Sequence, residues 1–361
     1  MSTQPTMRAA IYRRRGEVDV VDLPRPGGET DALVAVEYCG ICGTDLHMML
    51  DGWGPPDSVF GHEWSGRIHD PGTTGLATGT LVVGLPSPAC GSCALCRAGR
   101  TSLCRNRPEA GTGPERGAFA EFVAAGADRL FPVPSGVDAR AAAYTEPLAV
   151  ALHAITRSGL SVHPPRSSWS GPRVHTEGGH DQRALVMGAG PIGAAIIAVL
   201  AGAGIATAAV EPGEHRAALA HRLGAEVRAV EDLEITAHPG AAPADAVDVV
   251  FETSGARAAV ETALTQLKPG GTLVLVGTGL DLPQLDTNRV ILNELEVTGA
   301  FNYDADGFAD ALTLIGSGSL PLDDLLAPDE VRLDDLLATM HRLRTGSIAG
   351  KALVRPMGRT T

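Results

Sequence analysis

Aromatic side chains and basic runs are scarce in this sequence. Phe, Trp and Tyr make up 4% of the 361 residues, and the formal net charge is -13, from 29 basic and 42 acidic residues. No run of Lys and Arg extends beyond Arg13, Arg14 and Arg15. A protein that binds nucleic acid needs a basic surface to neutralise phosphates, so the composition argues against a nucleic-acid partner.

Long apolar segments are also few. The first residues carry no apolar stretch like a secretory signal, which predicts a cytoplasmic protein. Residues 184–210 contain no charged side chain and are long enough to imitate a membrane span. Their glycines, among them Gly188 and Gly202, fall at turn spacing. We therefore interpret the segment as a strand, a turn, a helix and a second strand, and expect no membrane partner.

Two patterns of secondary structure divide the chain. Residues 1–148 contain short alternating stretches bounded by Gly and Pro, which is typical of a β-rich domain. From Arg183 onwards, short apolar runs alternate with helical segments, which predicts an α/β domain with a doubly wound parallel sheet. The chain is also long enough for two domains. Between these regions, residues 161–182 are rich in Pro, Ser, Gly and His, and we predict an irregular exposed loop.

A glycine-rich turn follows the first of these apolar runs. It reads Gly188, Ala189, Gly190, Pro191, Ile192, Gly193. Small residues between a buried strand and a helix let the backbone approach a dinucleotide pyrophosphate at the helix N-terminus. Glu211 ends the next predicted strand, where a carboxylate binds the ribose hydroxyls of NAD and repels the extra phosphate of NADP. Arg216, a nearby cation, would weaken the repulsion of NADP. The sequence therefore predicts NAD, with NADP less favoured.

Four of the six cysteines are clustered at Cys90, Cys93, Cys96 and Cys104. Four thiolates at this spacing close a tetrahedral Zn²⁺ site that leaves no position for a substrate, so its role would be structural. An iron–sulfur cluster also uses four cysteines, and four reduced thiols without a metal are a further possibility. The clustering in a long chain argues against disulfides.

Three further motifs suggest a second metal site. Cys42 stands in a Cys-Gly-Thr-Asp sequence, His62 and Glu63 are adjacent, and Glu146 precedes a proline. A thiolate, an imidazole and a carboxylate are zinc ligands, and three protein ligands plus water define a catalytic zinc site. Whether Glu63 or Glu146 is the third ligand stays open at this point.

Together these motifs resemble the zinc-containing medium-chain dehydrogenase/reductase family, which includes alcohol, polyol and threonine dehydrogenases. The matching motifs, in the family's order, are CGICGTDLH at 39–47, GHE at 61–63, the four-cysteine lobe at about 88–106, EPLAVALH at 146–153 and GAGPIG at 188–193. The resemblance spans most of the chain. It implies a GroES-like catalytic domain of residues 1–148 and 303–361, interrupted by a Rossmann domain of residues 149–302.

The resemblance also implies two zinc ions per chain. Cys42 and His62 would hold the catalytic ion, and Glu63 would bind it in some states. Glu146 stands where alcohol dehydrogenases have a second cysteine. A glutamate at this position resembles polyol and threonine dehydrogenases. Cys90, Cys93, Cys96 and Cys104 would hold the structural ion.

A proton path and further cofactor contacts follow from the same resemblance. Thr44 would take the proton of the substrate hydroxyl and pass it through the cofactor ribose to His47, a residue type suited to this role because the unperturbed pKa of histidine lies near neutrality. Asp45 would orient His62. The segment from Val276 to Thr278 would meet the nicotinamide, and Lys351 would face the pyrophosphate.

The sequence therefore predicts a zinc-dependent, NAD-linked dehydrogenase that moves hydride between a secondary alcohol or polyol and the cofactor. The family further suggests a homodimer or homotetramer. A threonine- or cyclitol-type biosynthetic dehydrogenase is the nearest alternative. A zinc-free, NADPH-linked double-bond reductase would lack the ligand set, and a non-enzymatic protein that binds zinc and nucleotide would need neither Thr44 nor His47.

Overall fold

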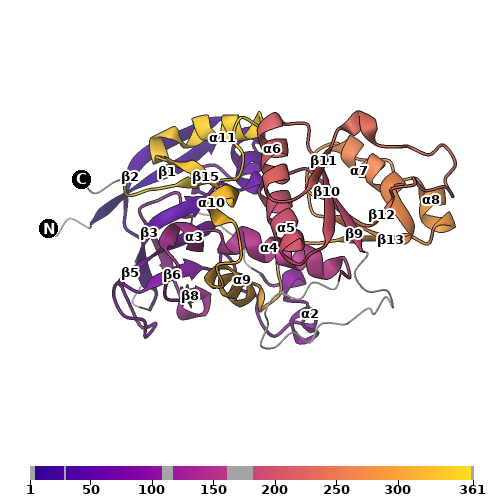
Figure 1. Ribbon diagram of the computed structural model, residues 1–361. Helices are drawn as coiled ribbons and strands as arrows, with labels where there is room; N and C mark the ends of the chain where they lie inside the picture. Colours follow the sequence, from indigo (N-terminus) through magenta and orange to yellow (C-terminus); the bar gives the residue numbers. More distant parts are fainter. Residues whose placement is uncertain (1–4, 28–29, 108–116, 161–181, 359–361) are drawn as a thin grey trace. The chain divides into compact units, whose positions relative to one another are not determined.

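The computed structural model describes residues 5–27, 30–107, 117–160 and 182–358 (Figure 1). The chain forms two compact units. Unit 1 comprises Met1–Glu146, Ala311–Ser317 and Leu326–Thr361, and unit 2 comprises Pro147–Asp310 and Gly318–Leu325. Residues 303–310, which we expected in the first domain, thus belong to unit 2. The loop predicted at 161–182, with its three histidines, lies outside the described residues except for Gln182.

Unit 1 is built mainly of antiparallel strands, as the alternating pattern predicted. One sheet has the strand order β2-β1-β4; the other has the order β15-β16-β3-β5-β6-β8, with β7 also paired to β3. The strands are β1 (Thr6–Arg14), β2 (Glu17–Pro24), β3 (Ala32–Gly40), β4 (Ser58–Val59), β5 (Glu63–Asp70), β6 (Leu81–Gly84), β7 (Phe122–Ala125), β8 (Leu130–Pro132), β15 (Leu326–Val331) and β16 (Lys351–Val354).

Strand β3 shows why these segments form a sheet with one buried face. Its alternate residues Ala32, Val34 and Val36 are fully buried, whereas the residues between them are only partly buried. A side-chain period of two directs every second residue into the core. The helices of this unit are short: α1 (Gly43–Leu46), η1 (His47–Asp51), α2 (Ala94–Arg97), η2 (Thr101–Leu103), η3 (Ala127–Arg129), α3 (Ala139–Ala142), η6 (Leu333–Asp335) and α11 (Leu336–Arg344).

The register of β3, β5 and β16 brings distant residues together. Gly40 at the end of β3 is opposite Glu63 at the start of β5, and Leu353 of β16 is opposite Gly40 on the other side. Lys351, two residues before Leu353, therefore begins its strand beside the same point. This arrangement places the candidate metal ligands of unit 1.

Unit 2 contains a six-stranded sheet with the order β11-β10-β9-β12-β13-β14, in which every pairing is parallel. The strands are β9 (Arg183–Met187), β10 (Ala206–Val210), β11 (Glu226–Arg228), β12 (Val247–Glu252), β13 (Leu267–Leu275) and β14 (Glu296–Gly299). From the central strand β9 the chain builds outward to β11, then returns to β12 on the other side. The α/β fold with a doubly wound sheet is thus confirmed, and its switch point lies between β9 and β12.

The helices of unit 2 are α4 (Thr145–Arg157, which begins in unit 1), α5 (Pro191–Gly202), α6 (Glu214–Arg222), η4 (Val230–Asp232), α7 (Arg257–Ala263), η5 (Leu264–Gln266), α8 (Thr287–Leu292), α9 (Gly307–Gly316, which ends in unit 1) and α10 (Leu322–Leu325). Figure 1 shows α5 and α6 on one side of the sheet and α7 on the other. The uncharged segment 184–210 forms β9, α5 and β10, as predicted. Within the described ranges, no helix has the length and hydrophobicity that crossing a membrane requires.

Candidate functional site

Three predicted zinc ligands converge in unit 1. Ligand atoms of Cys42, His62 and Glu63 all lie within 4.8 Å of one another. Cys42 lies just before helix α1, and Glu63 begins β5. Gly61 precedes His62 with φ +96°, and a Cβ there would lie 2.8 Å from the Cys39 sulfur. Only glycine fits this turn, which brings His62 towards Cys42.

Asp45 lies beside two of these ligands. Its Oδ2 accepts a hydrogen bond from the Cys42 N–H at 2.9 Å, and its Oδ1 lies 3.5 Å from His62 Nδ1. A carboxylate at Nδ1 leaves Nε2 of the ring for a metal. Burial alone would lower the pKa of His62, but the charges of Asp45 and Cys42 outweigh it and raise that pKa well above its ordinary value.

Lys351 lies inside this cluster and not at an open, pyrophosphate-facing position. It is 1% exposed, and its Nζ lies 2.7 and 2.6 Å from the two carboxylate oxygens of Glu63. It also donates to the Ile41 carbonyl at 3.1 Å. A Cβ at Gly40 would lie 2.2 Å from Glu63 Oε2, so only glycine leaves room for this pair. The structure thus departs from the expected role of Lys351, because its ammonium is already paired with a buried carboxylate.

Glu146 lies near the cluster but outside the three-residue ligand group. It is 7% exposed in the first turn of α4. Burial raises its pKa to about 7, and the neighbouring carboxylate of Glu63 adds to this effect. A nearby cation would reverse the shift, because it stabilises the ionised carboxylate.

The chemistry of these donors fits a zinc ion. Asp45, Glu63 and Glu146 are all buried acids, and Lys351 is a buried cation paired with Glu63. Cys42 adds a thiol to this acidic surplus. Buried charges in such excess need a compensating partner, and a divalent cation supplies one. A thiolate, an imidazole and carboxylates are the ligand set that zinc accepts.

The predicted proton path begins on the adjoining helices. Thr44 is an exposed residue of α1, and His47 begins η1. The His47 ring stacks on Trp53 with centroids 4.7 Å apart, and its Nδ1 lies 2.8 Å from Asp51 Oδ2. Sequence reasoning did not identify Asp51, although its position four residues after His47 was visible.

The four remaining candidate ligands form a separate lobe of unit 1. The sulfurs of Cys90, Cys93, Cys96 and Cys104 lie within 4.8 Å of one another, and all four thiols are free. Backbone N–H groups point at them: Cys93 N donates to the Cys90 sulfur at 3.3 Å, and Cys90 N donates to the Cys104 sulfur at 3.3 Å. Hydrogen bonds from Ser92 lower the pKa of Cys90 to about 5, which favours the thiolate. The lobe fits a closed structural zinc site.

The glycine turn of unit 2 has the shape that a dinucleotide needs. Gly188 has φ +95°. A Cβ at Gly193 would lie 2.0 Å from the Gly188 carbonyl, so the glycine permits close packing of α5 on β9. Gly190 precedes α5 with open space around it, and Pro191 and Ile192 form the first turn of the helix. The backbone is thus accessible at a helix N-terminus, where anions bind.

Glu211 follows β10 directly beside this turn. Its two carboxylate oxygens accept hydrogen bonds from the N–H groups of Ala189 and Gly213, each at 2.8 Å. Arg216 lies one turn further on, in α6. Val276 and Thr278 follow β13, and a Cβ at Gly255 would lie 2.2 Å from the Thr278 carbonyl. The predicted cofactor residues of unit 2 therefore follow the carboxyl ends of parallel strands, where nucleotides bind in this fold.

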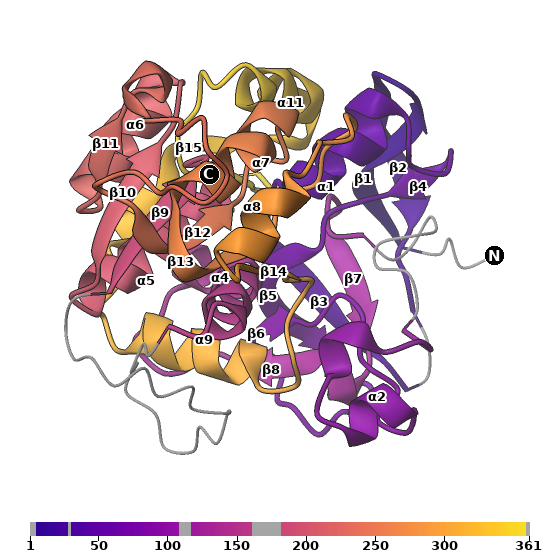
Figure 2. The ribbon, with the colours of Figure 1, turned by 90° about the vertical axis from the view of Figure 1, so that its right-hand side faces the viewer.

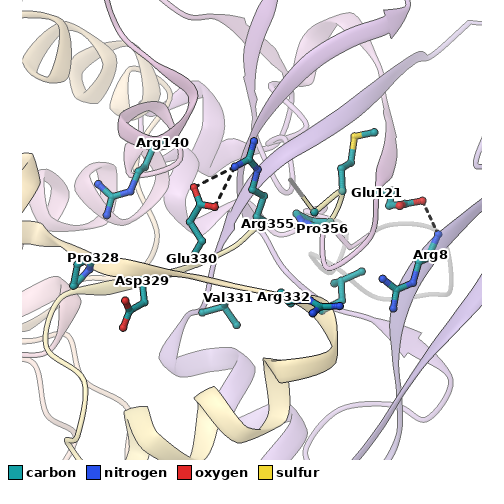
Figure 3. Close-up of a pocket in the computed structure, with 13 residues that line it drawn as sticks. Arg8, Glu121, Arg140, Pro328, Asp329, Glu330, Val331, Arg332, Arg355 and Pro356 are labelled. Carbon is teal, nitrogen blue, oxygen red and sulfur yellow. Dashed lines mark hydrogen bonds and ion pairs between the residues drawn. The ribbon is translucent and has the colours of Figure 1, made fainter. Parts of the chain in front are cut away.

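A hollow of about 730 Å³ lies elsewhere in unit 1 (Figure 3). The charged residues that line it are Arg8, Glu121, Arg140, Asp329, Glu330, Arg332 and Arg355. Arg355 pairs with Glu330 at 3.1 Å, and Arg8 pairs with Asp334 at 2.9 Å. None of the predicted site residues lines this hollow, and its charges of both signs compensate one another.

A two-domain chain with a parallel nucleotide-binding sheet and a partly buried Cys–His–Glu cluster has the features of a zinc dehydrogenase. Comparison with known proteins gives the same class. Residues 28–135 match the alcohol dehydrogenase GroES-like domain, and residues 191–317 match the zinc-binding dehydrogenase domain.

Individual relatives cover nearly the whole chain. The 2-dehydro-3-deoxy-L-galactonate 5-dehydrogenase of Pseudoalteromonas atlantica is 32% identical, over 89% of this chain and 91% of its own. The (R,R)-butanediol dehydrogenase of Saccharomyces cerevisiae is 30% identical, over 91% and 92%. A zinc-binding dehydrogenase of Sinorhizobium meliloti, solved with NADP, has a TM-score of 0.81 and 27% identity, over 98% and 100%. The chain belongs to the zinc-containing medium-chain dehydrogenase/reductase family and is an oxidoreductase that acts on CH–OH groups.

Proposed function

We propose that this enzyme oxidises a secondary hydroxyl of a polyol, diol or sugar acid, reversibly, with NAD⁺ as the preferred acceptor. The observation that supports this most directly is the cluster of Cys42, His62 and Glu63 with the buried Glu146 beside it. Glutamate in place of a second cysteine is the feature that resembles polyol and threonine dehydrogenases. The two relatives above are named for a diol and for a sugar acid.

In the proposed mechanism, Cys42 and His62 hold the zinc ion with a carboxylate of Glu63 or Glu146. When bound, zinc supplies a Lewis acid that makes a substrate hydroxyl acidic near neutral pH. The nicotinamide ring supplies the hydride acceptor. Asp45 holds His62 in the orientation and tautomer that binding requires.

The remaining step is proton removal. Thr44 would accept the hydroxyl proton, and His47 would be the base from which that proton leaves the site. The His47 side chain is 22% exposed, so it exchanges protons with solvent. Lys351 stays paired with Glu63, so this carboxylate lies next to a buried positive charge.

Substrate class is tested by initial rates of NADH formation with vicinal diols, polyols, sugar acids, threonine, cyclitols and simple primary alcohols. We expect the highest kcat/KM for a secondary hydroxyl that has a second oxygen on the neighbouring carbon. A strong preference for threonine or for a cyclitol would assign the biosynthetic alternative. A preference for simple primary alcohols would contradict the proposal.

The preference for NAD⁺ is assigned to Glu211. Replacing it with alanine removes a negative charge from the place where the extra phosphate of NADP⁺ would sit, so the ratio of kcat/KM for NADP⁺ to that for NAD⁺ should rise about tenfold or more. Glu214→Ala is the matched control, since this residue is exposed in the first turn of α6 and should leave the ratio unchanged. An unchanged ratio in Glu211→Ala would remove Glu211 from this role.

We further propose a cytoplasmic homodimer or homotetramer that associates through unit 2. The large exposed apolar residues concentrate in one segment: Leu280 (61% exposed), Leu282 (86%), Leu285 (40%), Ile291 (69%), Leu292 (59%), Val297 (37%) and Phe301 (63%). This segment includes α8, which faces the viewer in Figure 2, and β14, the last strand of the sheet. An exposed edge strand beside exposed apolar side chains favours association with a second copy.

The association surface is tested by Ile291→Asp combined with Leu292→Asp. Burying two carboxylates at an interface is costly, so we expect the mass measured by light scattering to fall towards the 37.2 kDa of one chain. Ile235→Asp is the control, because Ile235 is 64% exposed but lies outside the segment. A native protein that is already monomeric, or an equal effect of the control, would rule out this surface.

A further inference from the structure

Two side chains contact His47, and a third binds one of these two. The proposed proton path uses none of the three. Asp51 Oδ2 lies 2.8 Å from His47 Nδ1. Arg344 donates two hydrogen bonds to the same carboxylate, from NH1 to Oδ1 at 2.7 Å and from NH2 to Oδ2 at 2.9 Å. Trp53 stacks on the imidazole at an interplanar angle of 15°. The three contacts fix the ring plane of His47 and one of its two nitrogens.

The local backbone is built to bring these groups together. Residues His47–Asp51 form the π-helical turn η1, a rare geometry found frequently at functional sites. The turn ends at Gly52, whose φ of +85° favours glycine, and Gly52 N–H donates to the His47 carbonyl. The chain then turns back towards the start of η1, and Trp53 N–H also donates to the His47 carbonyl, at 3.3 Å.

Arg344 reaches this turn from a part of the sequence almost 300 residues away. It lies at the end of α11, and its NH2 also donates to the Leu46 carbonyl at 3.3 Å. The Asp51 side chain is 13% exposed and that of Arg344 is 39% exposed. A bidentate guanidinium–carboxylate pair of this kind fixes orientation more firmly than a single contact does.

The pairing determines which nitrogen of neutral His47 carries hydrogen. Hydrogen bonds from Arg344 lower the pKa of Asp51, so its carboxylate is ionised and accepts hydrogen bonds only. Nδ1 of His47 must then be the donor in the 2.8 Å contact. The lone pair of the neutral ring is therefore on Nε2, the nitrogen that a base at the end of a proton path uses.

We propose that Asp51 and Arg344 are positioning residues for proton removal. Asp51 holds His47 in the tautomer with a free Nε2, and Arg344 holds Asp51 in place and partly offsets its negative charge. The inference rests on the proposed function of His47. In the oxidation direction the proton arrives at Nε2 while the Nδ1 hydrogen stays on its bond to Asp51. Loss of the Nε2 proton to water then restores the same tautomer.

The positive charge of Arg344 partly offsets the negative charge of Asp51, and this is the distinctive part of the arrangement. Asp51, on the same helix, is the ion-pair partner of His47, and Arg344 on α11 is paired with that carboxylate. Asp45 lies two residues before His47, in α1, and Arg15 donates to the Leu50 carbonyl at 3.1 Å. Without Arg344, the Asp51 carboxylate would stabilise protonated His47 more strongly. Without Asp51, this stabilisation would be lost.

The test compares Asp51→Asn and Arg344→Gln in the pH dependence of kcat/KM for alcohol oxidation. For Asp51→Asn we expect the acidic limb to move about one unit to lower pH and the plateau to fall about 10- to 100-fold, since asparagine permits the other tautomer. For Arg344→Gln we expect the limb to move about one unit to higher pH with a smaller loss on the plateau. Arg344→Lys should restore the native limb, because it restores the charge.

Arg8→Gln is the matched control, since it breaks another distant Arg–Asp pair of unit 1, that of Arg8 with Asp334 at 2.9 Å. We expect no change in its pH profile. A purely structural role for Asp51 and Arg344 would lower activity in both variants without moving the two limbs in opposite directions. That outcome would overturn the proposal, as would an unchanged profile in both.

A second readout does not depend on turnover. With ¹⁵N-labelled histidine, the resonances of His47 are identified by their loss in His47→Gln. At pH 8 we expect Nδ1 of the native ring to carry the hydrogen, and a mixture of tautomers in Asp51→Asn. A native ring with its hydrogen on Nε2 would refute the inference. If instead His47→Gln keeps full activity while the native tautomer is as expected, the proton path of the proposed function fails and the positioning of the ring stands.

Discussion

Replacing Cys42 with alanine is expected to lower kcat/KM for alcohol oxidation by about a thousandfold or more. The reason is that three ligand atoms converge at this site, and Cys42 supplies the thiolate. Without it, Zn²⁺ is bound weakly or in the wrong geometry, and a Lewis acid that lowers the barrier by several kcal/mol is lost. Steady-state kinetics with zinc analysis of the purified variant measures both effects.

Cys39 provides the matched control. It is a fully buried core residue three positions before Cys42, and it belongs to neither ligand group found among the described residues. Cys39→Ala should keep most of the native kcat/KM and lower the free energy of unfolding by only about 1 kcal/mol. In Cys42→Ala the zinc content should fall from two ions to one per chain. Near-native turnover in Cys42→Ala, or equal loss in both variants, would refute the assignment.

Replacing Lys351 with methionine should produce the largest loss of stability. Lys351 and Glu63 form a fully buried ion pair, 1% and 0% exposed. Burial alone would lower the pKa of Lys351, but the charges of Glu63 and Cys42 outweigh it and raise that pKa, so the pair is ionised. Removing the cation leaves a buried carboxylate without its partner, which costs about 3–5 kcal/mol. Calorimetry of the zinc-loaded protein should show the loss as a lower unfolding temperature.

The chain contains one other lysine, and it is the natural control. Lys268 pairs with Asp248 at 2.9 Å, but the two side chains are 41% and 32% exposed. Lys268→Met should therefore cost less than about 1 kcal/mol. The double variant Lys351→Met with Glu63→Gln should be more stable than Lys351→Met alone, because no unpaired charge remains. Equal costs for Lys351→Met and Lys268→Met would show that the buried pair does not stabilise unit 1.

Local patterns predicted most of the fold. The apolar run Ala184–Met187, the glycine turn and the second strand at 207–210 all lie where their periodicity put them, because each signal needs only a few neighbouring residues. The exact ends of elements were less predictable: α7 ends at Ala263, a short 3₁₀ turn follows, and β13 begins at Leu267. The boundary of the second unit was also misplaced, since nothing in the sequence marks residue 310 as the crossing point.

The candidate site was predictable where its residues stand in motifs. Cys42, His62 and Glu63 were named from short spacings, and the structure places their ligand atoms together. Glu146 was also named as a candidate carboxylate ligand, and it lies beside this group, not within it. The sequence left open whether Glu63 or Glu146 is the third zinc ligand. The residue that pairs with Glu63, Lys351, lies 288 positions further along the chain, so this contact was not visible in the sequence.

Long-range polar pairs are what sequence reasoning missed. Lys351 was expected at the pyrophosphate from the family resemblance, whereas the register of β16 against β3 places it beside Glu63. Arg344 gave no signal at all, because its contact with Asp51 joins residues 293 positions apart. Such pairs follow from tertiary packing, which composition and periodicity do not encode.

The central claim is that a zinc ion held by the Cys42, His62 and Glu63 cluster enables hydride transfer from an alcohol to NAD⁺. The most direct test follows NADH formation at 340 nm with the best polyol or diol substrate, before chelation, after removal of the zinc ion held by this cluster, and after zinc is added back. The account predicts loss of NADH formation on chelation and recovery with zinc. Undiminished NADH formation after chelation, with the zinc content of the cluster shown to be zero, would contradict it.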